Sequence, residues 1–185
     1  MRVAPPSLSR YSVAMGMGPA DLLAAEKRIR PLPAWRPVED SGKIRWKAPL
    51  MIGGAVVEGL TLHARCIASE PGHDVSFVLE QALAGQSSVR IDRIDWKPIH
   101  EHNNKGIGPE ELRFITIKDS HRHNYHENLT KAGILRLHNL PIARPLDIIL
   151  PSFQSLVDFV AETYNIEDLK FLTPPPWTDD LFGTQ

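Results

Sequence analysis

Apolar and polar side chains alternate over several short stretches in the middle of the chain. Residues 43–48 (KIRWKA), 55–68 (AVVEGLTLHARCIA), 74–83 (DVSFVLEQAL) and 89–96 (VRIDRIDW) show this pattern, which is typical of strands with one buried face. The turn sequences EPGH (70–73) and AGQS (84–87) separate some of them. Links this short cannot hold a parallel crossover, so we predict an antiparallel meander. Two irregularities are expected, a bulge or turn at Gly59 and a bulge or twist near Arg93.

Helical spacing marks both sides of this strand-rich region. GPADLLAAEKRIR (18–30) predicts a helix that starts at Pro19 and ends near residue 30, and PSFQSLVDFVAETYNI (151–166) predicts a C-terminal helix. LRFITIK (112–118) is interpreted as a further strand, apolar on both faces. The fold class is therefore α+β: an antiparallel sheet of about four to six strands with an N-terminal and a C-terminal helix. We expect an irregular arm (1–18), one α+β domain (19–170) and a Pro-rich acidic tail (171–185).

Composition indicates a single globular domain in a reducing compartment. The chain has 185 residues, 42% hydrophobic and 23% charged, which suits one domain. No apolar run approaches the roughly 20 residues that span a bilayer, and the N-terminus is too polar for a signal-peptide core. Cys66 is the single cysteine and cannot form an internal disulfide. We expect a cytoplasmic protein with no membrane partner.

Charge is distributed unevenly although the net charge is only -1. Residues 1–50 contain nine Lys/Arg against four Asp/Glu, whereas residues 151–185 contain one against six. The basic N-terminal or the acidic C-terminal segment can therefore contact RNA or a protein partner, or both can simply be solvated. The basic segment alone is too weak to establish nucleic-acid binding.

Two His-x-His pairs are the strongest chemical signal. They are His100 with His102 and His121 with His123. Residues i and i+2 of a strand point to the same side, so two strand ends can gather four imidazoles, with Glu127 as a further ligand. Such a set suits Zn²⁺, Fe²⁺ or Ni²⁺. His-x-His-x-x-x-Glu also opens the first metal motif of cupins, but the rest of that motif is absent.

The same residues also suit a metal-independent ribonuclease. Histidine is the most frequent general acid or base near neutral pH. His121 and His123 would exchange protons with a phosphodiester, Arg122 or Lys118 would stabilise the developing charge, and Tyr125 would orient the substrate. An HNH-type nuclease fits less well because no Asn lies at the expected interval.

Simpler interpretations accompany each of these. The histidine segments can be polar loops and caps. His63, His73, His126 and His138 are expected to be structural, and Cys66 to be a buried, inert thiol. In RIDRIDW, we interpret Arg90 and Arg93 with Asp92 and Asp95 as cross-strand salt bridges on a solvent face.

The region from about residue 55 to 170 resembles an uncharacterised family of small bacterial proteins carried on phages and other mobile elements. The resemblance rests on short motifs, whose matching residues are Asp95, His100, Asn103, His121, His123, Tyr125, Glu127, Ala143, Pro145, Phe159 and Ile166. No known activity comes with it. It implies a mobile-element accessory, such as a toxin, an immunity factor or an inhibitor of host defence.

Three classes of function follow. The first is a histidine-cluster enzyme, with or without Zn or another divalent transition metal, acting on a phosphodiester such as RNA. The second is a non-catalytic protein-binding module with structural histidines. The third is such a module held together by a structural zinc site.

Overall fold

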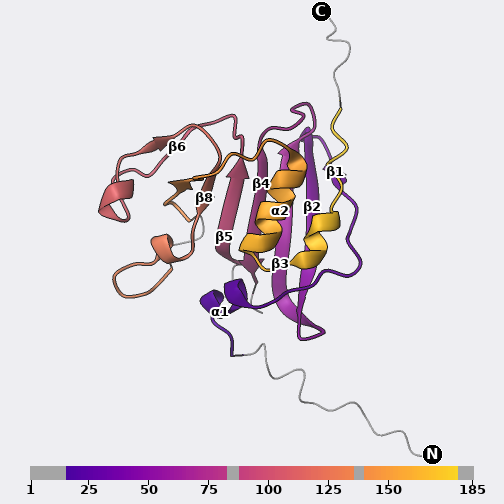
Figure 1. Ribbon diagram of the computed structural model, residues 1–185, viewed down its shortest axis with the longest axis horizontal. Coiled ribbons are helices and arrows are strands. Elements are labelled where there is room, and N and C mark those ends of the chain that lie inside the picture. Colours follow the sequence, from indigo (N-terminus) through magenta and orange to yellow (C-terminus); the bar gives the residue numbers. More distant parts are fainter. Residues whose placement is uncertain (1–15, 83–87, 136–139, 179–185) are drawn as a thin grey trace, which may run out of the picture.

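An antiparallel sheet forms the centre of the computed structural model, which describes residues 16–82, 88–135 and 140–178 (Figure 1). Within these residues the sheet has seven strands, in the spatial order β1 (Arg36–Val38), β2 (Lys43–Ile52), β3 (Ala55–Ile67), β4 (Val75–Gln81), β5 (Val89–Trp96), β8 (His121–His123) and β9 (Arg144–Pro145). A separate pair contains β6 (His102–Asn103) and β7 (Thr116–Ile117). The predicted antiparallel meander is confirmed, with more strands than the four to six expected.

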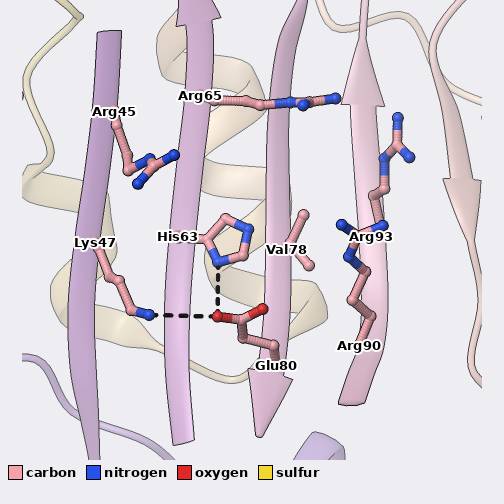
Figure 2. Close-up of a pocket in the computed structure, with 8 residues that line it drawn as sticks. All are labelled: Arg45, Lys47, His63, Arg65, Val78, Glu80, Arg90 and Arg93. Carbon is pink, nitrogen blue, oxygen red and sulfur yellow. Dashed lines mark hydrogen bonds and ion pairs between the residues drawn. The ribbon is translucent and has the colours of Figure 1, made fainter. Parts of the chain in front are cut away.

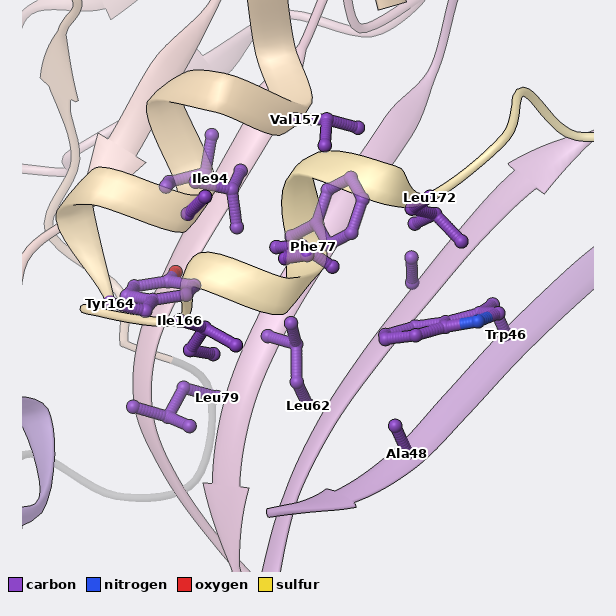
Figure 3. Close-up of a cluster of buried hydrophobic side chains, with 14 of the residues drawn as sticks. Trp46, Ala48, Leu62, Phe77, Leu79, Ile94, Val157, Tyr164, Ile166 and Leu172 are labelled. Carbon is purple, nitrogen blue, oxygen red and sulfur yellow. The ribbon is translucent and has the colours of Figure 1, made fainter. Parts of the chain in front are cut away.

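Helices cover one face of the sheet and bury the main core. The helix α2 (Phe153–Thr163) and the 3₁₀ helix η4 (Glu167–Phe171) lie across β2–β5 (Figure 1). Trp46, Phe77 and Ile94 of the sheet join Val157 of α2 in one buried cluster (Figure 3). The predicted C-terminal helix is confirmed, and it begins where the Ser152 side chain accepts a hydrogen bond from Ser155 N–H.

The N-terminal helix is shorter than predicted. The helix α1 spans only Pro19–Ala24. The buried Lys27 side chain folds back and donates hydrogen bonds to the carbonyls of Leu22, Leu23 and Ala25. The backbone of Lys27 instead pairs with the segment after α2, forming a bridge to Ile166. Tertiary pairing has overridden helix propensity here.

The predicted strand at 112–118 is mostly wrong. Leu112 ends the 3₁₀ helix η2 (Glu110–Leu112), and only Thr116 and Ile117 form a strand. Phe114 has a φ of 60° and its side chain is 76% exposed. Its ring lies against Gly106, where a Cβ would come within 2.5 Å of it. This left-handed backbone ends any continuous pairing.

A bulge in β5 sets which side chains reach the sheet face without helices, named here the open face. Leu79 pairs with Asp92 but Glu80 pairs with Arg90, so Ile91 is the extra residue. The predicted irregularity therefore exists, two residues before Arg93. Gly59 also lies at an irregularity, as predicted: its φ is 73°, and a Cβ there would overlap the Ala82 carbonyl.

Part of the predicted tail packs on the body of the molecule. Trp177 makes an edge contact with Phe153 at 5.8 Å between ring centroids, and the N–H of Thr178 donates to the Ala68 carbonyl. Residues 1–15 of the predicted arm and 179–185 of the predicted tail lie outside the described residues. In the part of the chain that is described, no helix has the length and apolar character needed to cross a membrane.

Candidate metal centre

Three histidines from two strands converge above the open face. His121 and His123 are two residues apart on β8 and point to the same side, while His102 comes from β6. One ring nitrogen from each lies within 4.8 Å of the other two. The ring centroids are 4.8 to 5.4 Å apart. The structure thus joins one member of the first His-x-His pair with both members of the second.

Asp95 completes the group from the neighbouring strand. It lies directly opposite His121 in the pairing of β5 with β8. Its Oδ2 atom is 3.2 Å from Nε2 of His121 and 3.1 Å from Nε2 of His123. Ser76 donates a hydrogen bond to Oδ1, and Arg93 contacts both carboxylate oxygens at 2.8 Å. Burial alone would raise the pKa of Asp95, but when Nε2 of His121 and of His123 carry protons, their hydrogen bonds and the charge of Arg93 hold it well below its usual range.

Carbonyl oxygens fix the orientation of all three rings. Nδ1 of His121 lies 2.8 Å from the Asp119 carbonyl, and Nδ1 of His123 lies 2.5 Å from the Leu140 carbonyl. Nε2 of His102 lies 3.0 Å from the Pro141 carbonyl. A carbonyl only accepts hydrogen bonds, so each of these nitrogens carries the proton. Histidines that bind metals are usually held in this way by the nitrogen that does not bind.

The second ring nitrogen of His121 and of His123 faces another hydrogen-bond acceptor, the Asp95 carboxylate. In neutral rings, Nε2 of His121 and of His123 are lone pairs, and both face the carboxylate of Asp95. With Asp95 ionised, protons can fill both gaps only if both rings become imidazolium, which with Arg93 places three cations around one carboxylate in a buried site. Burial lowers the pKa of His123 more than Asp95 raises it, which opposes that state. A single divalent cation would satisfy every acceptor at once.

The spacing of these acceptors suits adjacent ligands of one metal ion. Bonds of about 2.0–2.2 Å place adjacent ligand atoms about 2.9 Å apart at a right angle and about 3.4 Å apart at the tetrahedral angle. The distances from Asp95 to His121 and His123, 3.2 and 3.1 Å, fall in this range. His102, on the short β6–β7 pair, has a ring nitrogen within 4.8 Å of those of His121 and His123.

Asn104 holds the ring of His102 in place through a hydrogen bond to Nε2. This fully buried amide accepts from Nε2 of His102 at 3.0 Å and from the N–H of Ala143 at 2.9 Å. Its Nδ2 donates to the carbonyls of Leu112 and Ala143, both at 2.8 Å. The segment after residue 140, whose carbonyls orient two of the rings, is thereby tied to the β6–β7 pair.

A cleft of about 440 Å³ opens beside the cluster. Its lining includes His102, His121 and Asp95 together with the cations Lys43, Arg65 and Arg93. His100 is exposed and lines the same cleft, outside the three-histidine cluster. A small anionic group can therefore approach the histidines from solvent.

Other predicted site residues face elsewhere. Arg122 lies between His121 and His123 in sequence and so points to the opposite face, where it makes two 2.9 Å contacts with Asp92. Tyr125 packs against the core. Glu127 contacts Arg144 Nε at 2.5 Å rather than the histidines.

The remaining histidines make separate contacts. His63 lies 3.3 Å from Glu80 on the open face, His73 contacts the Pro71 carbonyl in a turn, and His126 is exposed. His138 lies outside the described residues.

Sequence reasoning missed Asp95, Arg93 and Asn104 as site residues. The interpretation of Asp92 and Asp95 as salt-bridge residues is confirmed in part, since Arg93 pairs with Asp95. The solvent face is wrong, because both carboxylates are buried, and Asp92 pairs with Arg122 from β8. The available signal was the conflict of parity in RIDRIDW, which places charged residues on both faces of one strand.

The comparisons with known proteins add no relative. No protein-family model, no curated protein and no solved structure matches this chain. The resemblance to a mobile-element family therefore stays a prediction, and the case for function rests on the geometry of the site.

Proposed function

We propose that the chain is a metal-dependent hydrolase of phosphodiesters, with RNA as its substrate class. His102, His121, His123 and Asp95 hold one divalent transition metal. Zinc is the first candidate, because it accepts imidazole and carboxylate ligands in this number, and Fe²⁺ and Ni²⁺ also suit the set.

One observation carries the proposal: Nε2 of two buried imidazoles and Oδ2 of one buried carboxylate face one another, and with neutral rings all three atoms are acceptors. Their separations are 3.1 and 3.2 Å, and each ring is held from behind by a carbonyl. Unpaired buried acceptors cost free energy, so this arrangement is not expected in a hydrophobic core or a surface loop.

The chemistry follows from the cleft beside the candidate ligands. A metal held there with a position open for water would lower the pKa of that water to about 7 and so supply hydroxide at neutral pH. The hydroxide oxygen would form a bond to phosphorus, the bond from phosphorus to the leaving oxygen would break, and that oxygen would take a proton from solvent. Arg93 and Arg65 line the cleft, where their charge stabilises the additional negative charge on the phosphate.

Cleavage of a labelled single-stranded RNA tests the proposal. We expect the chelated protein to be inactive and added Zn²⁺, Fe²⁺ or Ni²⁺ to restore activity. His123→Ala should lose at least 100-fold, because it removes a ligand. His126→Ala is the matched control, since His126 is exposed and outside the cluster. Activity that is indifferent to chelation and to His123→Ala would contradict the proposal.

A second candidate is a protein-binding module with a structural zinc site. The burial of the ligands favours it: His121 is 2% exposed and His123 is 1% exposed. Structural sites stabilise the fold outright. A protein that binds zinc, loses much of its Tm on chelation and cleaves no RNA would support this candidate over the hydrolase.

A further inference from the structure

The open face of the sheet carries a concentration of positive charge, named here the basic face. It consists of Arg36 on β1, Arg45 and Lys47 on β2, Arg65 on β3, and Arg90 and Arg93 on β5. Figure 2 shows five of these side chains above neighbouring strands, with the helices behind the sheet. They line a hollow of about 270 Å³ that shares Arg65 and Arg93 with the cleft of the metal centre.

Strand pairing arranges the face into rows that end at the candidate ligands. Residues directly opposite one another form a first row of Arg36, Arg45, Arg65, Ser76, Asp95 and His121. A second row contains Lys47, His63, Val78, Arg93 and His123. At about 4.8 Å between strands, the first row extends about 24 Å from the edge of the sheet to the metal centre.

In the first row, arginines lie opposite one another, and this repulsion is not compensated by contacts within the fold. Arg36 lies opposite Arg45, and Arg45 lies opposite Arg65. Like charges directly opposite one another destabilise a sheet. Among the described residues these three guanidinium groups make no hydrogen bond or ion pair. By contrast, Lys47 contacts Glu80 at 3.4 Å and Arg93 contacts Asp95 (Figure 2).

We infer that the basic face binds a single polynucleotide strand through its phosphates and leads it to the metal centre. Guanidinium groups suit phosphate oxygens because they donate paired hydrogen bonds. The rows contain no Phe, Tyr or Trp on which bases can stack, so binding is independent of sequence. Because His121 is only 2% exposed, a flexible single strand suits the cleft better than a rigid duplex. That the bound strand is led to a reaction rests on the proposed function. That the basic face binds the strand does not.

Binding of a 12-nucleotide labelled RNA, measured by fluorescence anisotropy in the presence of chelator, tests the inference without cleavage. Arg45→Gln/Arg65→Gln removes two charges and leaves a shorter, polar side chain at each position. We expect Kd to rise at least tenfold. The slope of log K against log salt should fall by about 1.4, since each phosphate contact on a single strand contributes about 0.7. The Tm should stay equal or increase, because opposed like charges are removed.

Lys131→Gln/Lys170→Gln is the matched control. It removes two exposed lysines outside the basic face. We expect its Kd to stay within twofold of wild type. The inference is overturned if both double variants weaken binding equally, if Arg45→Gln/Arg65→Gln binds as wild type, or if polyglutamate competes as well as RNA at equal charge. Single-stranded DNA of the same sequence should bind comparably, and tighter binding of the duplex would overturn the single-strand assignment.

Cleavage separates this inference from the proposed function. His123→Ala should bind RNA normally and cleave none, whereas Arg45→Gln/Arg65→Gln should keep its metal and show a raised KM. A wild-type protein that binds RNA through the basic face but never cleaves it would refute the hydrolase and leave the binding track in place. Cleavage with an unchanged KM in the arginine variant would refute the track alone.

Discussion

At the scale of single residues, the site depends on groups that orient rings rather than on the rings alone. Asn104 uses its carbonyl oxygen and its NH₂ group at the same time and is completely buried. It aims His102 at the other two histidines, which backbone carbonyls aim directly. Such outer contacts are worth 10- to 100-fold in metal affinity.

We expect Asn104→Ala to lower zinc affinity at least tenfold and the free energy of unfolding by about 2–3 kcal/mol, because it leaves the carbonyls of Leu112 and Ala143 without donors. Chelator competition and urea denaturation measure the two effects. Asn103→Ala is the control, since Asn103 is exposed and should cost under about 1 kcal/mol. Equal effects of the two substitutions would show that Asn104 does not position His102.

The sequence carried the histidines of the site but not their partners. The period of two in a strand was enough to place His121 and His123 on one side. The position of Asp95 beside these histidines was beyond reach because β5 pairs with β8 and skips the β6–β7 pair, and nothing local specifies such pairing. The same alternation places Arg122, which lies between His121 and His123, on the opposite face of the sheet. It is therefore not beside the histidines, contrary to the prediction.

At the scale of elements, Asp92 joins two strands to the C-terminal helix. Its carboxylate is fully buried and accepts from Arg122 of β8, from Tyr164 at the end of α2, and from the backbone N–H of Tyr125. Asp92 lies on the face of the sheet opposite the histidines. Its contact with Arg122 therefore holds β8 against β5. Buried pairs of this kind cost most when only one partner is removed.

Asp92→Asn should therefore reduce the free energy of unfolding by about 3 kcal/mol, because Arg122 loses its counter-charge while the shape is kept. Urea denaturation measures this change. Asp147→Asn, an exposed site, should cost less than about 0.5 kcal/mol. A loss below 1 kcal/mol for Asp92→Asn would mean that β8 is held by other contacts.

The link between α1 and the rest of the chain should respond to pH through Lys27. Burial lowers the pKa of Lys27 from 10.5 to about 8. Between these values the unfolded chain keeps a proton that the folded chain has released, so the free energy of unfolding rises with pH. Urea denaturation of wild type at pH 8 and pH 10 should show this rise relative to Lys27→Met. Parallel profiles of the two proteins would contradict it.

Elements with strong local signals were predictable, and those set by distant contacts were not. Alternation in β2 and β3 and helical spacing in α2 agree with the burial each element makes. The end of α1 depends on a bridge between Lys27 and Ile166, and the interruption at Phe114 depends on its packing against Gly106. Neither partner can be found from a local window.

At the scale of the whole molecule, the two faces of one sheet carry different side chains. Helices and the apolar core occupy one face (Figure 3), while the basic face occupies the other (Figure 2), and the strand pairing places His121 and His123 on that same face. The positive excess found in residues 1–50 was expected to act as a basic segment. Three of its cations, Arg36, Arg45 and Lys47, instead belong to the sheet and share one face with Arg65 and Arg93.

The most direct test of the account is the metal content of purified, tag-free protein, measured by elemental mass spectrometry. We expect close to one equivalent of a divalent transition metal in wild type and in His100→Ala, whose residue lies outside the cluster. His123→Ala and Asp95→Ala should each retain less than a tenth of it. Wild-type protein that stays metal-free after incubation with Zn²⁺, Fe²⁺ and Ni²⁺ would contradict the metal centre and, with it, the proposed hydrolase.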